Sequence, residues 1–168
     1  RLLEDDPELS DRITQRSVFW EDYGSALLKL GRLDAAKQQL ERAVVLHRRP
    51  EIFDLLAQVH EAQHDVDRAE RFYLQSLAQD PSYVPALRAL ARLSLQRGQP
   101  ERSVEFLVRA LEFAPNDVSI QTNLGAAYMR AGQGEQAAVH LNRANQLRQL
   151  QDLREQLVAQ VRGNPNAP

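Results

Sequence analysis

The sequence contains no cysteine, which excludes disulfide bonds, thiol nucleophiles and cysteine-based zinc sites. Long apolar runs are also absent. The longest runs are only a few residues, as at Ala43-Val44-Val45-Leu46. A membrane-spanning helix needs roughly 20 such residues, so we expect no direct insertion into a membrane. The formal net charge is only −2, with both signs scattered along the 168 residues, which disfavours nucleic acid as a partner.

Glycine and proline are scarce, with 7 and 8 residues, whereas alanine, leucine, glutamine, glutamate and arginine are abundant. This composition favours α-helix. Lysine occurs only at Lys29 and Lys37, and arginine supplies the other basic residues. We interpret this as the codon bias of a GC-rich genome, which favours a bacterial source.

What the chain does contain is a repeat. Small residues recur at intervals of 33 or 34 in two separate columns, Gly24, Ala57, Ala91 and Gly125, and Ala36, Ala69, Ser103 and Ala137. Large residues precede the first column at Tyr23, Leu56, Leu90 and Leu124. Small residues let two helix backbones approach closely, and large ones fill the space between helices. The columns therefore predict four copies of one helix pair.

Proline residues separate the copies, because proline has no N–H and biases the preceding residue away from helix. The first helix of each pair, helix A, is expected at about 17–30, 51–63, 84–97 and 118–131. The second, helix B, is expected at about 34–47, 66–79, 100–113 and 134–147. Candidate N-caps are Asp34, Asp65, Ser82 and Asn116.

The pattern resembles the tetratricopeptide repeat (TPR), whose signature is W-x2-L-G-x2-Y, then A-x3-F, then P. The fourth copy reads Leu124-Gly125-x2-Tyr128 followed by Ala137-x3-Leu141. The middle copies depart from the signature, since His60 and Ser94 stand where the family favours tyrosine. The resemblance implies an all-α TPR superhelix, a right-handed α-solenoid of four helix pairs.

We assign the repeats to 17–49, 50–83, 84–117 and 118–151. Residues 1–16 are expected to form an N-terminal extension or the end of a preceding repeat, with the first helix reaching back to about residue 9. Residues 148–163 continue a helical apolar stripe and are interpreted as a C-terminal capping helix. A dimerising coiled coil is the alternative for this stripe, and residues 164–168 are expected to be a disordered tail.

One catalytic motif requires attention. His60-Glu61-Ala62-Gln63-His64 matches H-E-x-x-H, which on a helix places two imidazoles on one face for zinc and supplies a glutamate base. However, His60 falls in the column of Leu27 and Tyr128, so it is expected to pack between helices. His64 falls in the column of turn glycines. We therefore predict no catalytic, metal-binding or cofactor-binding residue and no enzymatic activity.

The TPR resemblance implies a concave groove, lined mostly by helix A, that binds an extended peptide or a helix of a partner protein. The residues carried over to this groove are Glu21, Asp54, Gln58, Glu61, Arg88, Arg92, Gln96, Thr122, Asn123, Met129 and Arg130. Its first half is acidic, at Glu21, Asp54 and Glu61, and its second half is basic. We hypothesise that the partner has the opposite polarity.

One TPR subclass clamps a C-terminal carboxylate with lysine, arginine and asparagine side chains. This chain has Glu21, Ser25, Leu55, Pro85 and Ala89 at those places, so that ligand is not implied.

The resulting prediction is a noncatalytic protein–protein interaction scaffold, which the family resemblance associates with bacterial envelope, secretion or polysaccharide-related assemblies. A docking or regulatory domain of a larger glycan-processing or membrane enzyme is the alternative. Self-association through the terminal repeats is a further expectation, and the periplasm or envelope is slightly favoured over the cytoplasm.

Overall fold

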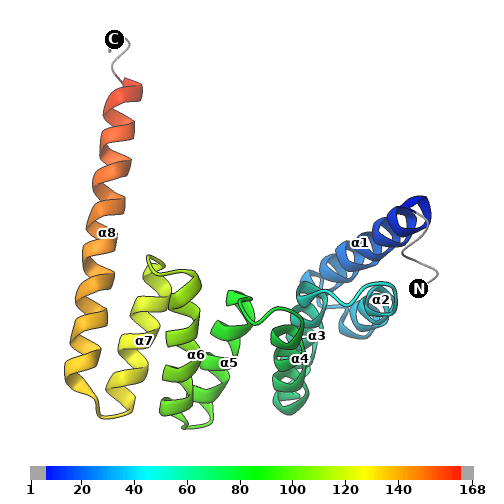
Figure 1. Cartoon of the computed structure of the whole chain (residues 1–168), viewed down its shortest axis with the longest axis horizontal. Coiled ribbons are helices and arrows are strands. Elements are labelled where there is room, and N and C mark those ends of the chain that lie inside the picture. The colour runs from blue at the N-terminus through cyan, green and yellow to red at the C-terminus, as the bar shows by residue number, and fades with distance from the viewer. Residues whose placement is uncertain (1–6, 164–168) are drawn as a thin grey trace. The chain divides into compact units, whose positions relative to one another are not determined.

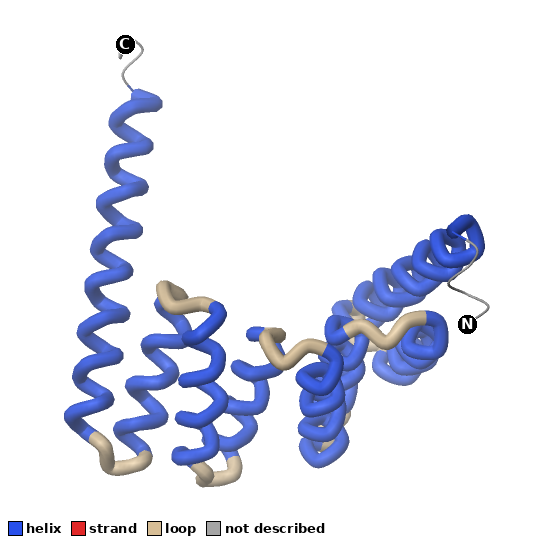
Figure 2. Tube along the Cα trace, in the orientation of Figure 1, coloured by secondary structure: helices blue, strands red, loops and turns tan. Residues whose placement is uncertain are grey.

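The computed structural model describes residues 7–163, and every regular element in that range is an α-helix (Figures 1 and 2). The helices are α1 (Pro7–Lys29), α2 (Leu33–Leu46), α3 (Pro50–Ala62), α4 (Val66–Gln79), α5 (Val84–Gln96), α6 (Pro100–Phe113), α7 (Val118–Arg130) and α8 (Gly134–Gly163). The predicted all-α class is therefore confirmed. The expectations for residues 1–6 and for the tail at 164–168 lie outside the described residues. No helix in the described range has an apolar stretch that could cross a bilayer.

The helices begin and end close to the predicted positions because turn residues fix them. Each A helix is followed by a residue in the left-handed region, with φ of 71°, 61°, 70° and 74° at Gly31, His64, Gly98 and Gly132. Glycine adopts this conformation without a steric penalty, and His64 is the exception.

Two aspartates cap helices at their N-termini. Asp65 caps α4 as predicted, and its carboxylate accepts a hydrogen bond from the Arg68 amide at 3.0 Å. The cap of α7 is Asp117 rather than its predicted neighbour Asn116, and it accepts from the amides of Ser119 and Ile120. Two adjacent residues of equal capping tendency explain the difference, because the side chain that reaches the free amides depends on the local turn.

The chain divides into two compact units, Arg1–Leu93 and Ser94–Pro168, and the boundary falls inside α5. In the N-terminal unit α1 packs on α2, α2 on α3 and α3 on α4, and in the C-terminal unit α7 packs on α6 and α8. The first core cluster is made of Leu27, Ala36, Leu40, Ala43, Ile52, Leu56 and Val59. Of these residues, Leu27, Ala36 and Leu56 belong to columns that the sequence analysis described.

The small-residue column has the predicted role. A Cβ on Gly24 would lie 2.7 Å from Cγ of Leu40, and one on Gly125 would lie 2.7 Å from Cγ of Leu141. Both distances are shorter than van der Waals contact. Helices A and B of the first and fourth repeats therefore approach each other closely enough to require glycine.

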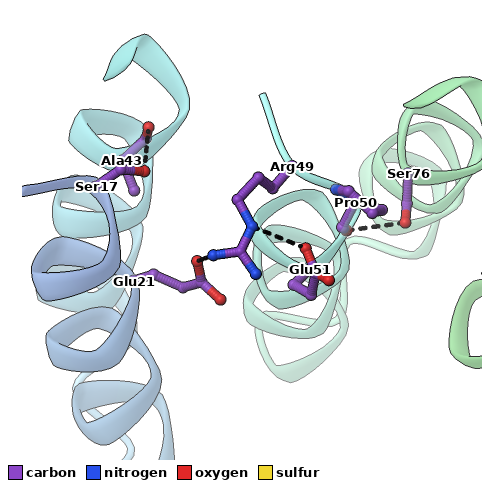
Figure 3. Close-up of polar contacts among 7 residues, drawn as sticks. All are labelled: Ser17, Glu21, Ala43, Arg49, Pro50, Glu51 and Ser76. Atoms are coloured by element: carbon purple, nitrogen blue, oxygen red, sulfur yellow. Dashed lines mark hydrogen bonds and ion pairs between the residues drawn. The ribbon is translucent and has the colours of Figure 1, made fainter. Parts of the chain in front are cut away.

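Serine hydroxyls join successive elements at equivalent places in the first two repeats (Figure 3). The Ser17 hydroxyl on α1 donates to the carbonyl of Ala43 at 3.3 Å, and the Ser76 hydroxyl on α4 donates to the carbonyl of Pro50 at 2.8 Å. Ser17 and Ser76 are both fully buried. Burial without such bonds would be costly, so the small polar residues in these columns serve as links.

The last helix, α8, is a single helix of 30 residues. No glycine or proline interrupts it between Glu135 and Arg162, so it continues past the fourth repeat. The segment expected to be a separate capping helix is its second half, and every side chain from Arg148 to Val161 is exposed. The capping role expected for this segment stays a prediction.

Candidate functional site

The predicted groove residues fall into both compact units, and each group is described within its own unit. Six lie in the N-terminal unit, on α1, α3 and α5, namely Glu21, Asp54, Gln58, Glu61, Arg88 and Arg92. Five lie in the C-terminal unit, namely Gln96, Thr122, Asn123, Met129 and Arg130. The first group contains most of the charge.

Helix α3 contributes three of these residues at positions i, i+4 and i+7, which places them on one helical face. The Gln58 amide donates to Oδ2 of Asp54 at 2.7 Å. The Asp54 side chain is buried, with 8% exposure, whereas Gln58 is exposed. The glutamine therefore covers the carboxylate from the solvent side.

Glu61 is held by two partners from other helices. The buried Tyr73 hydroxyl on α4 donates to Oε2 of Glu61 at 2.6 Å, and Nη2 of Arg92 on α5 donates to both carboxylate oxygens at 2.6–2.7 Å. The pKa of the Tyr73 hydroxyl is raised by burial and by its hydrogen bond to Glu61. The predicted groove residues Glu61 and Arg92 are therefore brought together and compensate each other's charge.

Glu21 is paired by a residue that the sequence analysis missed. Nη1 of Arg49 lies 3.1 Å from Glu21, and its Nε lies 3.3 Å from Glu51, so the guanidinium stands between two carboxylates (Figure 3). Burial raises the pKa of Glu21 despite the opposing effect of Arg49. Arg49 precedes α3 in a connecting segment, and the family pattern assigns groove residues to helix A, so only its position beside Pro50 could have indicated this role.

Asp54 differs from the other two acids, because among the described residues it has no cationic partner. Its hydrogen bond from Gln58 is the interaction that the structure shows. Burial raises the pKa of Asp54 from 3.8 to about 6, the bond from Gln58 lowers it, and the charges of Glu61 and Glu51 raise it further. The carboxylate is thus kept in a site that disfavours its ionised form.

Tyr83 is a second residue near Asp54 that the sequence did not indicate. The side chain is half-buried. Its hydroxyl pKa is raised by burial first and then by the negative charges of Asp54, Glu51 and Glu21. The electrostatic potential around Asp54 is therefore negative, even though Arg49 neutralises Glu21 and Arg92 neutralises Glu61.

The predicted residues of the C-terminal unit form no comparable network. Thr122 donates to the carbonyl of Val118 at 2.8 Å and accepts from Arg148 at 2.9 Å. Asn123, Met129 and Arg130 are exposed on α7.

The H-E-x-x-H motif does not have the geometry that zinc binding requires. His60 is buried and its ring stacks on Phe72, with centroids 5.2 Å apart. Burial lowers the pKa of His60, so the ring favours its neutral form. His64 lies in the turn after α3, with φ of 61°, so the two rings do not share a helical face. In the described part of the chain, no three His, Cys, Asp or Glu side chains gather to hold a metal ion.

Comparison with solved structures gives the same fold. MamA matches 90% of this chain and 85% of its own at 17% identity, with a TM-score of 0.71. PilF of Pseudomonas aeruginosa matches 80% of this chain and 62% of its own at 19% identity, with a TM-score of 0.72. The first TPR of Spaghetti (RPAP3), solved with an HSP90 peptide, matches 71% of this chain and 98% of its own at 18% identity, with a TM-score of 0.66.

Comparison by sequence is narrower in extent. The human interferon-induced protein with tetratricopeptide repeats 2 is 25% identical over 73 residues, which cover 44% of this chain and 16% of that protein. Two family models described as tetratricopeptide repeat match residues 22–84 and 61–121. The sequence repeats in phase four times, the copies fold into helix pairs, and both family models match. The chain therefore belongs to the tetratricopeptide repeat family.

Proposed function

We propose that this chain is a noncatalytic interaction scaffold that binds an extended peptide or a helix of a partner protein on the faces of its A helices. The TPR fold supports this proposal, as does the similar TPR of RPAP3, which was solved with a bound HSP90 peptide. In the N-terminal unit the binding face is centred on Asp54, with Gln58 and Glu61 on the same helix and Glu21 on α1.

The observation that carries the proposal is the state of Asp54. Its carboxylate is buried, its pKa is raised to about 6 mainly by burial, and the described residues supply no cation to it. A buried charge without a counterion destabilises a fold. A partner that inserts a lysine or arginine here would supply the missing cation, so we propose a basic partner segment for this face.

The same reasoning separates this site from the carboxylate clamp of other TPR proteins. In TPR proteins that clamp a C-terminal carboxylate, lysine, arginine and asparagine stand at the positions that Glu21, Ser25, Leu55, Pro85 and Ala89 occupy here. The peptide bound to the RPAP3 TPR is SRMEEVD, which is rich in acidic residues. A ligand of that charge would be repelled by the face around Asp54.

Selection from a random peptide library tests the proposal. Displayed 12-residue peptides are selected on the wild-type protein at low salt and measured by fluorescence anisotropy against Asp54→Asn. The matched control is Glu41→Gln, which removes an exposed carboxylate on the B helix α2. We expect lysine- or arginine-rich peptides whose affinity falls about ten-fold or more in Asp54→Asn and stays unchanged in the control.

Two results would contradict the proposal. One is a set of selected peptides that are neutral or acidic. The other is a basic set that binds the wild type and Asp54→Asn equally. Salt provides an independent check, because affinity carried by a charge pair falls as ionic strength rises.

We further propose that the chain acts in a bacterial envelope, secretion or polysaccharide-related assembly. The family resemblance supports this role. Fractionation of the source cells, with an antibody against the native protein, tests it. Exclusive recovery with cytosolic markers would refute this part and leave the binding proposal standing.

A further inference from the structure

Four polar side chains share one face of α3, at successive spacings of three, four and three residues. They are Glu51, Asp54, Gln58 and Glu61. An arginine pairs with the acid at each end of this row. Nε of Arg49 lies 3.3 Å from Oε2 of Glu51 (Figure 3), and Nη2 of Arg92 lies 2.6 Å from Oε2 of Glu61. The described residues therefore supply a cation to both ends of the row and none to its middle.

Asp54, in the middle of the row, has a neutral partner in place of an arginine. Nε2 of Gln58 donates to Oδ2 of Asp54 at 2.7 Å. One carboxylate oxygen is thus engaged by an amide, and within residues 7–163 no hydrogen bond ends on the other oxygen, Oδ1. Asp54 is only 8% exposed, so a group that reaches Oδ1 must enter a nearly closed site.

Two further oxygen acceptors lie beside this carboxylate. Gln58 donates through its nitrogen, which leaves its carbonyl oxygen Oε1 to accept a hydrogen bond. The half-buried Tyr83 hydroxyl is the second acceptor. Burial raises its pKa, and the next largest cause is the charge of Asp54, so the two groups are close enough to interact. In the part of the chain that the structure describes, neither oxygen has a hydrogen-bond partner.

This set of acceptors fits an ammonium group better than a guanidinium group. A lysine ammonium is a compact charge whose three donors can turn toward separate acceptors. An arginine guanidinium is a planar fork of five donors, and it binds a carboxylate best through both oxygens at once. Because Gln58 engages Oδ2 of Asp54, the second arm of the fork has no free oxygen opposite it. Donors left unpaired in a buried site weaken binding.

We propose that the Asp54 site binds a lysine of the partner in preference to an arginine, and that Gln58 sets this preference. The ammonium lies against Oδ1 of Asp54, with Oε1 of Gln58 and the Tyr83 hydroxyl as its other acceptors. Gln58 keeps its own hydrogen bond to Oδ2. This inference rests on the proposed function, because it names the side chain that the basic partner segment inserts.

The length of lysine and the charges along the row agree with this arrangement. The ammonium stands at the end of an unbranched four-carbon stem, which can pass the exposed Gln58 while the partner backbone stays above the helix. Arg49 and Arg92 repel a second cation from the two ends of the row. The inserted lysine is therefore held at Asp54.

Matched peptides test the proposal. A selected peptide that binds through Asp54 is made with either lysine or arginine at its anchor position, and both forms are measured by fluorescence anisotropy at pH 8. The Asp54 carboxyl, with a pKa of about 6, is ionised there. We expect the lysine form to bind the wild type about five-fold more tightly or better. In Gln58→Ala both oxygens of Asp54 are free, so the arginine form should gain and the preference should disappear.

Gln63→Ala is the matched control. The Gln63 amide also donates to an aspartate, Oδ1 of Asp34 at 3.1 Å, but this pair is exposed and joins the end of α3 to α2. The substitution should leave the ratio of the two affinities unchanged. Circular dichroism of each variant checks that the fold is intact.

A second measurement needs no selected peptide. N-acetyl-lysine methylamide and N-acetyl-arginine methylamide are titrated to millimolar concentrations, and the side-chain amide signal of Gln58 is followed by NMR. We expect the lysine compound to shift this signal more than the arginine compound does. In Asp54→Asn neither compound should shift it, because the charge that attracts them is absent.

Three results would overturn the proposal. The first is an Asp54-dependent peptide that binds equally well or better with arginine, which would leave the proposed function standing. The second is a lysine preference that persists in Gln58→Ala, which would assign the preference to another residue. The third is a lysine compound that shifts the Gln58 signal no more than the arginine compound does. If no selected peptide depends on Asp54, the proposed function fails, and the NMR titration alone decides the lysine preference.

Discussion

Replacing Asp54 with asparagine should stabilise this protein at neutral pH. The carboxyl is 8% exposed and lies beside Gln58, whose amide donates to it at 2.7 Å. Asparagine has the same shape and keeps a carbonyl oxygen that can accept this bond. The substitution therefore removes the charge and replaces one carboxylate oxygen with an NH₂ group.

The magnitude follows from linkage between protonation and folding. In the unfolded chain the Asp54 carboxyl ionises with a pKa of 3.8, whereas in the folded protein burial raises the pKa to about 6. Between these values the folded state binds more protons than the unfolded state, so stability falls as pH rises through this window. At 1.36 kcal/mol for each pKa unit, the full penalty above pH 6 is about 3 kcal/mol.

Asp54→Asn has no ionisable group at this position, so this destabilisation is absent from the variant. The difference in unfolding free energy between variant and wild type should therefore change by up to about 3 kcal/mol, in favour of the variant, between pH 3.5 and pH 8. The asparagine amide introduces N–H donors that need partners, and unpaired buried donors cost about 1–3 kcal/mol. That cost shifts the whole difference curve and leaves its pH dependence unchanged.

The assay is urea denaturation followed by circular dichroism at several pH values for both proteins. His60 acts in the opposite direction, because burial lowers its pKa below 6.5 and folding stability is lost as pH falls below that value. His60 is present in both proteins, so its effect cancels in the difference. A difference curve that is flat with pH would refute the assignment of a raised pKa to Asp54.

Three further predictions concern packing and turns, each measured by urea or thermal denaturation. Gly125→Ala should lower the free energy of unfolding by about 1–3 kcal/mol, because the new Cβ would lie 2.7 Å from Cγ of Leu141 on the facing helix. The control is Gly134→Ala, whose Cβ would have nothing within 4 Å and which should be neutral or stabilising. Equal effects of the two substitutions would contradict the close-packing argument. His64→Gly should raise the free energy of unfolding by about 1 kcal/mol, because glycine adopts the left-handed φ of 61° without strain. Gly132→Ala at the equivalent turn should lower it by a similar amount. A destabilised His64→Gly protein would show that the turn is unstrained. A chain ending at Gln149 should keep its thermal midpoint within about 2 °C, since the side chains of 150–161 are exposed; a larger loss would mean that this segment caps the last repeat after all.

The fold was predictable because packing constraints repeat. A small residue where two helices touch, a large residue beside it and a left-handed turn after helix A occur at fixed intervals, and each fixes local geometry. Even the departures from the family pattern follow this logic. His60 replaces the expected tyrosine and stacks on Phe72, whereas in the fourth repeat Tyr128 stacks on His140 with centroids 5.4 Å apart. In the second repeat the histidine of the stacked pair lies on helix A, whereas in the fourth repeat it lies on helix B.

The charge network was not predictable, because it depends on long side chains from different repeats. Arg92 meets Glu61 across 31 residues of sequence, and Arg49 meets Glu21 across 28. Arginine can reach several neighbours from one backbone position, so column spacing alone does not choose its partner. The position of Asp54 on the A-helix face was assigned from the sequence, but its burial and its lack of a cation required side-chain geometry.

These pairings change how the charge of the groove should be probed. Reversing Arg88 and Arg92 is the natural test of the predicted acidic-to-basic gradient. However, Arg92 donates to both oxygens of Glu61, so a carboxylate at this position would repel Glu61 and leave the Tyr73 hydroxyl bonded to an unbalanced charge. A loss of partner binding would then have a structural cause. Asp54 has no such counterion in the described structure, and its removal is expected to stabilise the fold. Weaker binding by a more stable Asp54→Asn protein could only be attributed to the missing charge.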